Sequence, residues 1–418
     1  MSAQYHALDS KMSSERAAKA ARLMSQFARR TGLASPGQDQ QRYLWTDAFA
    51  VCNFLELFQR TGDPDHRRSA TQLIDQVHQV LGRFRDDDVR RGWISALDDE
   101  IACRHPTAGG LRIGKSLKER AAHEPLDERR EWDRDGQYFH YLTKWMHALC
   151  EAAFFTGESV YARWAVDLAN AAFQGFVRRA ASGEVVGLAW KMSTDLSRPL
   201  VPATGLHDAL DGFITFREVQ NAVAKMQADV TLADLPAAIE SLSVLCRHRN
   251  WTTDDPLGIG GLLFDACRLC QLPSEERLAD VSLLDEIMDA CSQGLIVFLA
   301  NKALRQPQSY RLAFRELGLA IGLCALPIIA DTIAKDESRF GSRPGLQGAV
   351  DMLLRYESVA EEIISFWFPH AQQQDKSWQA HQNINDVMLA TALVPELFLS
   401  VGERVPRPAE RRQDPPAG

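Results

Sequence analysis

The chain has 418 residues, of which 45% are hydrophobic and 24% are charged, as is ordinary for a globular protein. It carries 47 lysine and arginine residues and 55 aspartate and glutamate residues, so its formal net charge is −8. This acidic balance argues against nucleic acid or an anionic membrane as the main partner. Composition also excludes collagen-like, disulfide-rich and largely disordered chains, and it allows either two or three domains or one large domain built from repeats.

The sequence predicts a cytoplasmic protein without a membrane span. Six basic residues interrupt segment 1–30, which therefore lacks the apolar core of a signal peptide. The longest apolar run, 317–330, is too short to cross a bilayer, and Pro327 would kink it. The eight cysteines are expected to be free thiols, because Cys267 and Cys270 form a CxxC pair inside a helical pattern rather than in a redox motif.

Helical periodicity dominates the chain, and no convincing run of alternating strand residues is present. The pattern predicts twelve helices, at residues 12–30, 42–60, 66–84, 136–156, 160–180, 207–227, 233–249, 256–271, 281–301, 310–333, 345–367 and 381–400. Gly62 and Gly157 are predicted C-terminal caps, each followed by an acid that begins the next helix. Segments 49–80 and 147–176 share this arrangement, which indicates an internal repeat of helical hairpins.

The predicted helices alternate in character along the chain. Five of them are apolar on nearly all sides, at 42–60, 136–156, 256–271, 310–333 and 381–400, whereas those that follow or separate them carry a single apolar stripe. A helix that is apolar all round is buried, and a striped helix covers another element. This alternation favours an inner ring of six helices inside an outer ring of six, with helix 12–30 as the outer partner of the last helix.

In helix number, alternation and hairpin turns, residues 12–400 resemble the six-hairpin, (α/α)6 toroid superfamily. The resemblance implies an all-α fold with inner and outer helix rings. The superfamily includes inverting glycosidases, unsaturated-uronide hydrolases and sugar 2-epimerases and, more distantly, lanthionine and terpene cyclases. A shared fold does not choose among these activities.

The predicted organisation is a single toroid domain at 12–402, between a disordered N-terminus at 1–11 and a disordered tail at 403–418. The domain contains an insertion at 85–134 in which 23 of 50 side chains are charged. An insertion of this length is either functional or disordered. Its tryptophans favour an ordered lid or wall of a cavity, and a mobile loop is the alternative.

In a ring of this topology the inner helices run parallel, so their N-termini and the loops before them share one mouth. Six N-terminal dipole ends suit anionic or hydroxyl-rich ligands. The residues expected there are Asp47, Asp133, Asp135, Asp208, His140, His207 and His381 as catalytic candidates, and Trp45, Tyr43, Tyr138, Trp190, Arg112, Lys115 and Arg311 as binding candidates. Aromatic rings that cover sugar rings, together with carboxylates and imidazoles, suit a saccharide ligand.

The main hypothesis is a glycoside hydrolase that uses paired carboxylates and neither metal nor cofactor. Asp133 or Asp135 would supply one carboxylate and Asp47 or Asp208 the other. Helix capping is the simpler role for any one of these acids. Zinc-protease, EF-hand, P-loop and dinucleotide-binding motifs are absent from the sequence.

Two alternatives remain open. A sugar epimerase or isomerase needs two bases on opposite sides of one carbon, and His140 with His207 or His381 would form such a pair. A toroid without catalytic activity could instead bind a glycan or a protein. The sequence does not indicate the oligomeric state.

Overall fold

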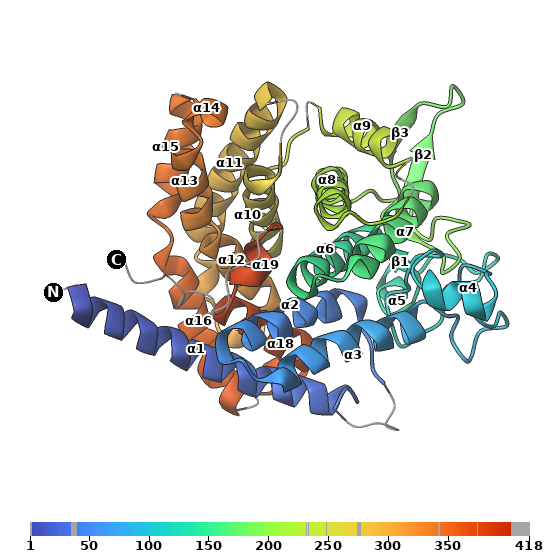
Figure 1. Cartoon of the computed structure of the whole chain (residues 1–418), viewed down its shortest axis with the longest axis horizontal. Helices are drawn as coiled ribbons and strands as arrows, with labels where there is room; N and C mark the ends of the chain where they lie inside the picture. The colour runs from blue at the N-terminus through green and yellow to red at the C-terminus, as the bar shows by residue number, and fades with distance from the viewer. Residues whose placement is uncertain are drawn as a thin grey trace, which may run out of the picture.

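The structure is a computed structural model that describes residues 2–34, 40–230, 232, 234–247, 249–273, 277–341, 343–373 and 375–402. Its main feature is a closed ring of six inner helices (Figure 1). These are α2 (Leu44–Thr61), α6 (Phe139–Thr156), α8 (Asp208–Met226), α10 (Pro256–Gln271), α12 (Ala313–Cys324) and α18 (Gln382–Leu393). Each packs against the next, and α18 packs against α2, which closes the ring.

A second layer of helices covers the inner ring. It consists of α1 (Ser2–Arg30), α3 (Pro64–Leu81), α7 (Ser159–Phe176), α9 (Leu235–Cys246), α11 (Arg277–Ala300) and α16 (Ser358–Gln373). α3, α7, α9 and α11 each pack against the inner helix that precedes them in the chain, α1 packs against α18 and α2, and α16 packs against α12 and α18. The all-α fold and the (α/α)6 toroid of six hairpins are therefore confirmed.

Two of the predicted helices, at 310–333 and 345–367, are divided in the structure. The helix expected at 310–333 breaks at Ala325 into α12 and α13 (Leu326–Lys335), because Pro327 occupies the first turn of a new helix. The helix expected at 345–367 is divided into α15 (Pro344–Leu354) and α16, and α14 (Glu337–Phe340) precedes them. α13 and α15 pack together beside α10 and α11.

The ends of the chain are described as follows in the structure: helix at the N-terminus and no described residue after 402. α1 begins at Ser2, so helix extends into residues 2–11, for which the sequence predicts no structure. The tail predicted at 403–418 lies outside the described residues. The last predicted helix, 381–400, is divided into α18 and the short α19 (Glu396–Leu399) by Pro395, after α17 (Lys376–Gln379) has led into α18.

α19 forms the floor of the ring, at the C-terminal ends of the inner helices (Figure 1). The Phe398 ring stacks on Phe49 and on Phe264, with ring centroids 4.3 and 4.4 Å apart. The carbonyl oxygen of Leu399 accepts a hydrogen bond from Gln271 Nε2 at 2.8 Å, at the end of α10. The chain thus turns back beneath the ring and closes it from one side.

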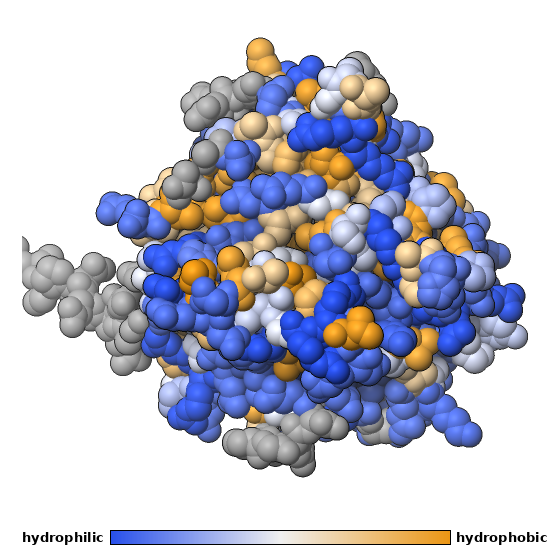
Figure 2. Space-filling view, turned by 90° about the vertical axis from the view of Figure 1, so that its right-hand side faces the viewer, coloured by the Kyte–Doolittle hydropathy of each residue, from blue (hydrophilic) through white to orange (hydrophobic). Residues whose placement is uncertain are grey.

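The charged insertion at 85–134 is described throughout and contains α4 (Asp99–Arg104) and α5 (Glu128–Glu131). Four short strands lie near it: β1 (Gln137–Tyr138) pairs with β4 (Lys191–Met192), and β2 (Val177–Arg179) pairs with β3 (Val185–Leu188), both in antiparallel fashion. The face of the molecule on this side is covered mainly by hydrophilic side chains (Figure 2).

One stretch of the described residues, Ala313–Lys335, is long and apolar enough to cross a membrane, and 56% of its most apolar window is buried. In the structure this stretch comprises two helices, because the chain breaks at Ala325. α12 belongs to the inner ring, where an all-apolar surface is required by packing. The apolar character of α12 is thus explained by its burial inside the toroid.

Backbone contact between α10 and α12 depends on two glycines, Gly260 and Gly322. A Cβ atom added to Gly260 would lie 2.1 Å from the carbonyl oxygen of Gly318, and one added to Gly322 would lie 2.6 Å from the Gly260 Cα atom. Neither contact is possible without moving a backbone. Only glycine therefore allows these two inner helices to approach to the observed distance.

We expect Gly260→Ala to lower the free energy of unfolding by about 1–3 kcal/mol, because the new methyl group forces α10 and α12 apart. Gly261→Ala is the matched control on the same helix, since no atom lies within 4 Å of the position that its Cβ would take. It should raise stability by about 0.5–1 kcal/mol through helix propensity. Urea unfolding of both variants measures the difference, and equal stabilities would contradict the close approach.

Candidate functional site

A cavity of about 330 Å³ opens at the N-terminal ends of the inner helices. The first turns of four of them contribute to its wall: Trp45 from α2, His140 from α6, Asp208 from α8 and Leu257 from α10. Phe398 of α19 lines the cavity from below. The helix starts therefore meet at one mouth, as the parallel arrangement of the inner ring requires.

Asp208 is the most perturbed carboxyl group of this cavity. Its side chain is only 8% exposed, and its Oδ2 atom is buried without a hydrogen-bond partner among the described residues. Burial, and secondarily the negative charge of Asp211, raises the pKa of Asp208 to about 7. At neutral pH this group is therefore present both as a carboxylic acid and as a carboxylate.

Two histidines share the cavity with Asp208. The Nδ1 atom of His140 is 3.7 Å from Asp208 Oδ1, which is too long for a hydrogen bond, and it has no other partner among the described residues. The ring is enclosed by Tyr138, Tyr141 and Trp190, with ring centroids 4.9–6.4 Å away. Burial and the nearby positive charge of Lys144 lower the pKa of His140 to about 4, so the imidazole is neutral at pH 7.

His207 is held by the backbone before α10. Its Nε2 atom is 2.9 Å from the carbonyl oxygen of Trp251, so Nε2 carries the hydrogen and donates it. Burial lowers the pKa of His207, and the remaining lone pair is on Nδ1. The cavity thus contains two neutral imidazoles, each with a nitrogen free to accept a proton.

Aromatic side chains extend from this cavity towards the mouth. Trp190 packs on Tyr138 at 5.1 Å, and the exposed Trp132 packs edge-on against Trp190 at 5.3 Å. Tyr141 packs on Tyr138 at 5.1 Å and shares a hydrogen bond of 2.6 Å with Tyr43 between their hydroxyl groups. The mouth therefore offers broad ring faces of the kind that cover the apolar faces of sugars.

Lys115, in the insertion, lies close to one of these aromatic rings. Its Nζ atom is 5.3 Å from the centroid of the Tyr43 ring. Among the predicted binding cations it differs from Arg112 and Arg311, which are both buried in ion pairs. Arg112 binds Asp135 at 2.8 Å, and Arg311 binds Glu316 through two nitrogens, at 2.8 and 2.6 Å.

A buried charge network lies along α8 and α10 and was not anticipated from the sequence. Lys144 Nζ is 2.8 Å from Asp211 Oδ2, and Arg268 lies 2.7 Å from Asp211, 2.6 Å from Asp265 and 3.0 Å from Glu218. Burial alone would raise the pKa of Asp211, but Lys144 and Arg268 hold it below its ordinary value. Burial and the charge of Asp211 raise the pKa of Asp265 to about 6.

The spacing of residues along the predicted helices could have revealed part of this network. Lys144 follows His140 by four residues on α6, and Asp211 follows His207 by four residues at the start of α8. Residues four apart lie on the same face of a helix, so both could have been placed beside the histidines.

The four predicted carboxylates do not meet in one place. Asp135 is fully buried and accepts hydrogen bonds from Arg112 Nη1 at 2.8 Å and the Gly114 backbone at 2.9 Å, which fastens the insertion to the ring. Asp133 is exposed.

Asp47 is buried in α2, where it accepts a hydrogen bond from the Tyr43 backbone at 3.0 Å. Burial, opposed by the charge of Arg42, raises the pKa of Asp47 to about 6.

Of the predicted catalytic residues, Asp208, His140 and His207 line the cavity, together with the predicted binding residues Trp45 and Trp190. His381 is exposed and packs against Phe314 at 5.5 Å, outside this lining. The structure thus brings together one carboxyl group, two histidines and two tryptophans from four separate segments.

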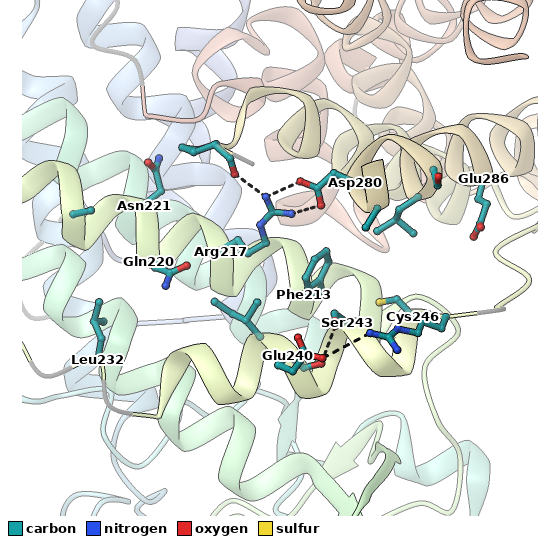
Figure 3. Close-up of a pocket in the computed structure, with 17 residues that line it drawn as sticks. Phe213, Arg217, Gln220, Asn221, Leu232, Glu240, Ser243, Cys246, Asp280 and Glu286 are labelled. Atoms are coloured by element: carbon teal, nitrogen blue, oxygen red, sulfur yellow. Dashed lines mark hydrogen bonds and ion pairs between the residues drawn. The ribbon is translucent and has the colours of Figure 1, made fainter. Parts of the chain in front are cut away.

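A second hollow, of about 730 Å³, lies outside the ring between α8, α9 and α11 (Figure 3). Arg217 projects into it from α8 but is already bound to Asp280, at 2.7 and 2.9 Å, and to the Pro273 carbonyl oxygen at 2.7 Å. None of the residues that line it also lines the cavity at the mouth.

No family model and no curated protein sequence matches the chain. A search of solved structures finds similarity to cellobiose 2-epimerase from Spirochaeta thermophila DSM 6192, with 12% sequence identity and a TM-score of 0.41. The similarity covers 75% of this chain and 73% of that chain. The chemistry of the cavity is therefore inferred from its own residues.

We expect Asp135→Asn to destabilise the protein by about 3–5 kcal/mol, because it leaves the buried Arg112 guanidinium without its carboxylate. Asp133→Asn, on the exposed side of the same segment, should change stability by less than about 0.5 kcal/mol. Chemical denaturation of the two variants provides the comparison. A stable Asp135→Asn protein would show that Asp135 does not anchor the insertion.

Proposed function

We propose that the chain is an enzyme that epimerises or isomerises a sugar by moving a proton at the carbon next to the carbonyl group. The observation that carries this proposal is the presence of two neutral imidazoles and a carboxyl group with a pKa near 7 around one cavity. Proton transfer at carbon needs bases whose lone pairs are available, and a nearby acid for the carbonyl oxygen.

Each group has a role in the proposed reaction. One imidazole, His140 or His207, removes the proton from the carbon next to the carbonyl. The electron pair of that C–H bond forms a C=C bond, and the carbonyl oxygen takes a proton from Asp208, which gives an enediol. The other imidazole takes up a proton from solvent and delivers it to the opposite face of the carbon, and the enediol hydroxyl returns its proton to Asp208. The first imidazole then releases its proton to solvent, so that both histidines are neutral again.

The remaining walls of the cavity suit a small polyhydroxylated molecule. Trp45 and Trp190 present ring faces, and Lys144 and Thr253 supply polar groups. A volume of about 330 Å³ lies at the lower end of the range found for small-molecule sites. A saccharide ligand is therefore proposed, with the open mouth leaving room for further sugar units.

The cavity supports hydrolysis of glycosides less well, because that reaction requires a pair of carboxyl groups, one acting as acid and the other as base or nucleophile. Of the carboxylates predicted for this role, Asp208 lines the cavity. Asp211, Asp255 and Asp265 also line it, but a cation binds each of them: Lys144 binds Asp211, Arg315 binds Asp255 and Arg268 binds Asp265.

Incubation with reducing sugars in D2O tests the proposal directly, because an enediol intermediate takes up deuterium at the carbon next to the carbonyl. We expect His140→Gln and His207→Gln each to reduce this exchange by about 100-fold or more. His123→Gln, on the exposed surface of the insertion, is the matched control and should retain exchange. Release of a sugar from a glycoside without deuterium uptake would contradict the proposal and favour hydrolysis.

The pH dependence of kcat/KM should follow the two perturbed pKa values. Activity requires His140 unprotonated, so it should rise through about pH 4, and it requires Asp208 protonated, so it should fall above about pH 7. Asp208→Asn should lower the rate and remove the alkaline fall. A native profile that stays flat from pH 6 to pH 9 would contradict the role of Asp208.

A further inference from the structure

Three side chains with metal-ligand chemistry meet beneath the floor of the cavity. His147 and Glu151 are one helical turn apart on α6, and Glu218 faces them from α8. One possible ligand atom from each lies within 4.8 Å of the others. All three residues are at most 1% exposed, so they form an interior cluster rather than a group of surface acids.

His147 is oriented as a metal-binding histidine would be. Its Nε2 atom is 3.0 Å from the backbone carbonyl oxygen of Phe398 and donates a hydrogen bond to it. Nδ1 faces Glu218 Oε1 at 2.7 Å, a hydrogen-bond distance, so a proton lies between these two atoms, and a bound cation would replace that proton. A backbone carbonyl that fixes the second ring nitrogen in this way is the usual support of a histidine ligand.

Glu151 supplies an independent observation. Its Oε2 atom accepts a hydrogen bond from Ser400 Oγ at 2.9 Å, whereas its Oε1 atom is buried and has no partner among the described residues. A buried polar atom without a partner is costly, and native structures contain few of them. A cation between Oε1 and the two neighbouring ligands would satisfy this atom.

Around the cluster, buried carboxyl groups also outnumber the basic side chains that bind them. Four buried carboxyl groups, those of Glu151, Glu218, Asp211 and Asp265, lie along this part of α6, α8 and α10. Two basic side chains bind members of this set, Lys144 at Asp211 and Arg268 at Asp211, Asp265 and Glu218. Neither binds Glu151, and a divalent cation at the cluster would supply compensating charge there.

We propose that His147, Glu151 and Glu218 bind one divalent transition-metal cation, of which Zn²⁺ fits the ligands best. One imidazole nitrogen and two carboxylates are ordinary zinc ligands, at about 2.0–2.2 Å. Two tetrahedral ligands at these distances are about 3.3 Å apart. His147 Nδ1 and Glu218 Oε1, now 2.7 Å apart, must therefore separate slightly when the ion binds.

The ion has a structural role that is separate from the proposed sugar chemistry. The His147 ring packs against Phe264 and Phe398, at 5.0 and 5.2 Å, and both phenylalanines line the cavity from the other side. The metal therefore lies below the floor and joins α6 and α8. Through the Phe398 carbonyl group and Ser400 it also fixes the C-terminal segment that forms this floor.

Metal content and thermal unfolding of the full chain test the site without an activity assay. After treatment with a chelator, the native chain should take up one equivalent of Zn²⁺, retain it through gel filtration and unfold several degrees higher. Glu151→Gln and His147→Gln should weaken binding by about 100-fold. Glu56→Gln, which removes a buried carboxylate of α2 outside the cluster, is the control and should still bind one equivalent.

Co²⁺ titration of the native chain gives a second readout that does not depend on the folding of any variant. Binding through one nitrogen and two oxygens at a four-coordinate site produces visible absorption bands, which Zn²⁺ should abolish by displacement. The proposal is overturned if the native chain retains no Zn²⁺ and shows no such bands. It is also overturned if Glu151→Gln and His147→Gln bind the metal as tightly as the native chain does.

Discussion

Close packing of parallel helices around a ring is the constraint on which the rest of the molecule depends. The inner helices can surround one small cavity only if their backbones approach closely, and between α10 and α12 two glycines, Gly260 and Gly322, allow direct backbone contact. Because each hairpin returns through an outer helix, all inner helices point the same way. Their first turns then meet at the mouth, and their last turns receive α19 as a floor.

The charge network inside this ring sets the properties of the cavity. Arg268 is fully buried and holds Asp211, together with Lys144, in its ionised form. The negative charge of Asp211 then adds to burial in raising the pKa of Asp208. A guanidinium beneath the cavity thereby helps to keep a carboxylic acid available at neutral pH beside two neutral imidazoles.

Helix periodicity and hairpin turns predicted the toroid, because both depend on local sequence. Trp45, His140, Trp190, His207 and Asp208 could be placed at the mouth for the same reason, since each lies at or before the start of an inner helix. The roles of Asp135 and Arg268 could not be predicted. Asp135 binds an arginine 23 residues earlier, and Arg268 binds carboxylates on a different helix, so these partners are defined only by the folded structure. α19 was missed because its apolar residues continue the pattern of α18 across Pro395.

A crystal structure of the chain with a bound reducing sugar would test the central claim most directly. The account predicts that the sugar lies at the mouth of the ring against Trp45 or Trp190, with the carbon next to the carbonyl between the imidazoles of His140 and His207 and the carbonyl oxygen within hydrogen-bond distance of Asp208. A sugar bound in the hollow between α8, α9 and α11, or one whose reactive carbon only a single histidine can reach, would contradict it.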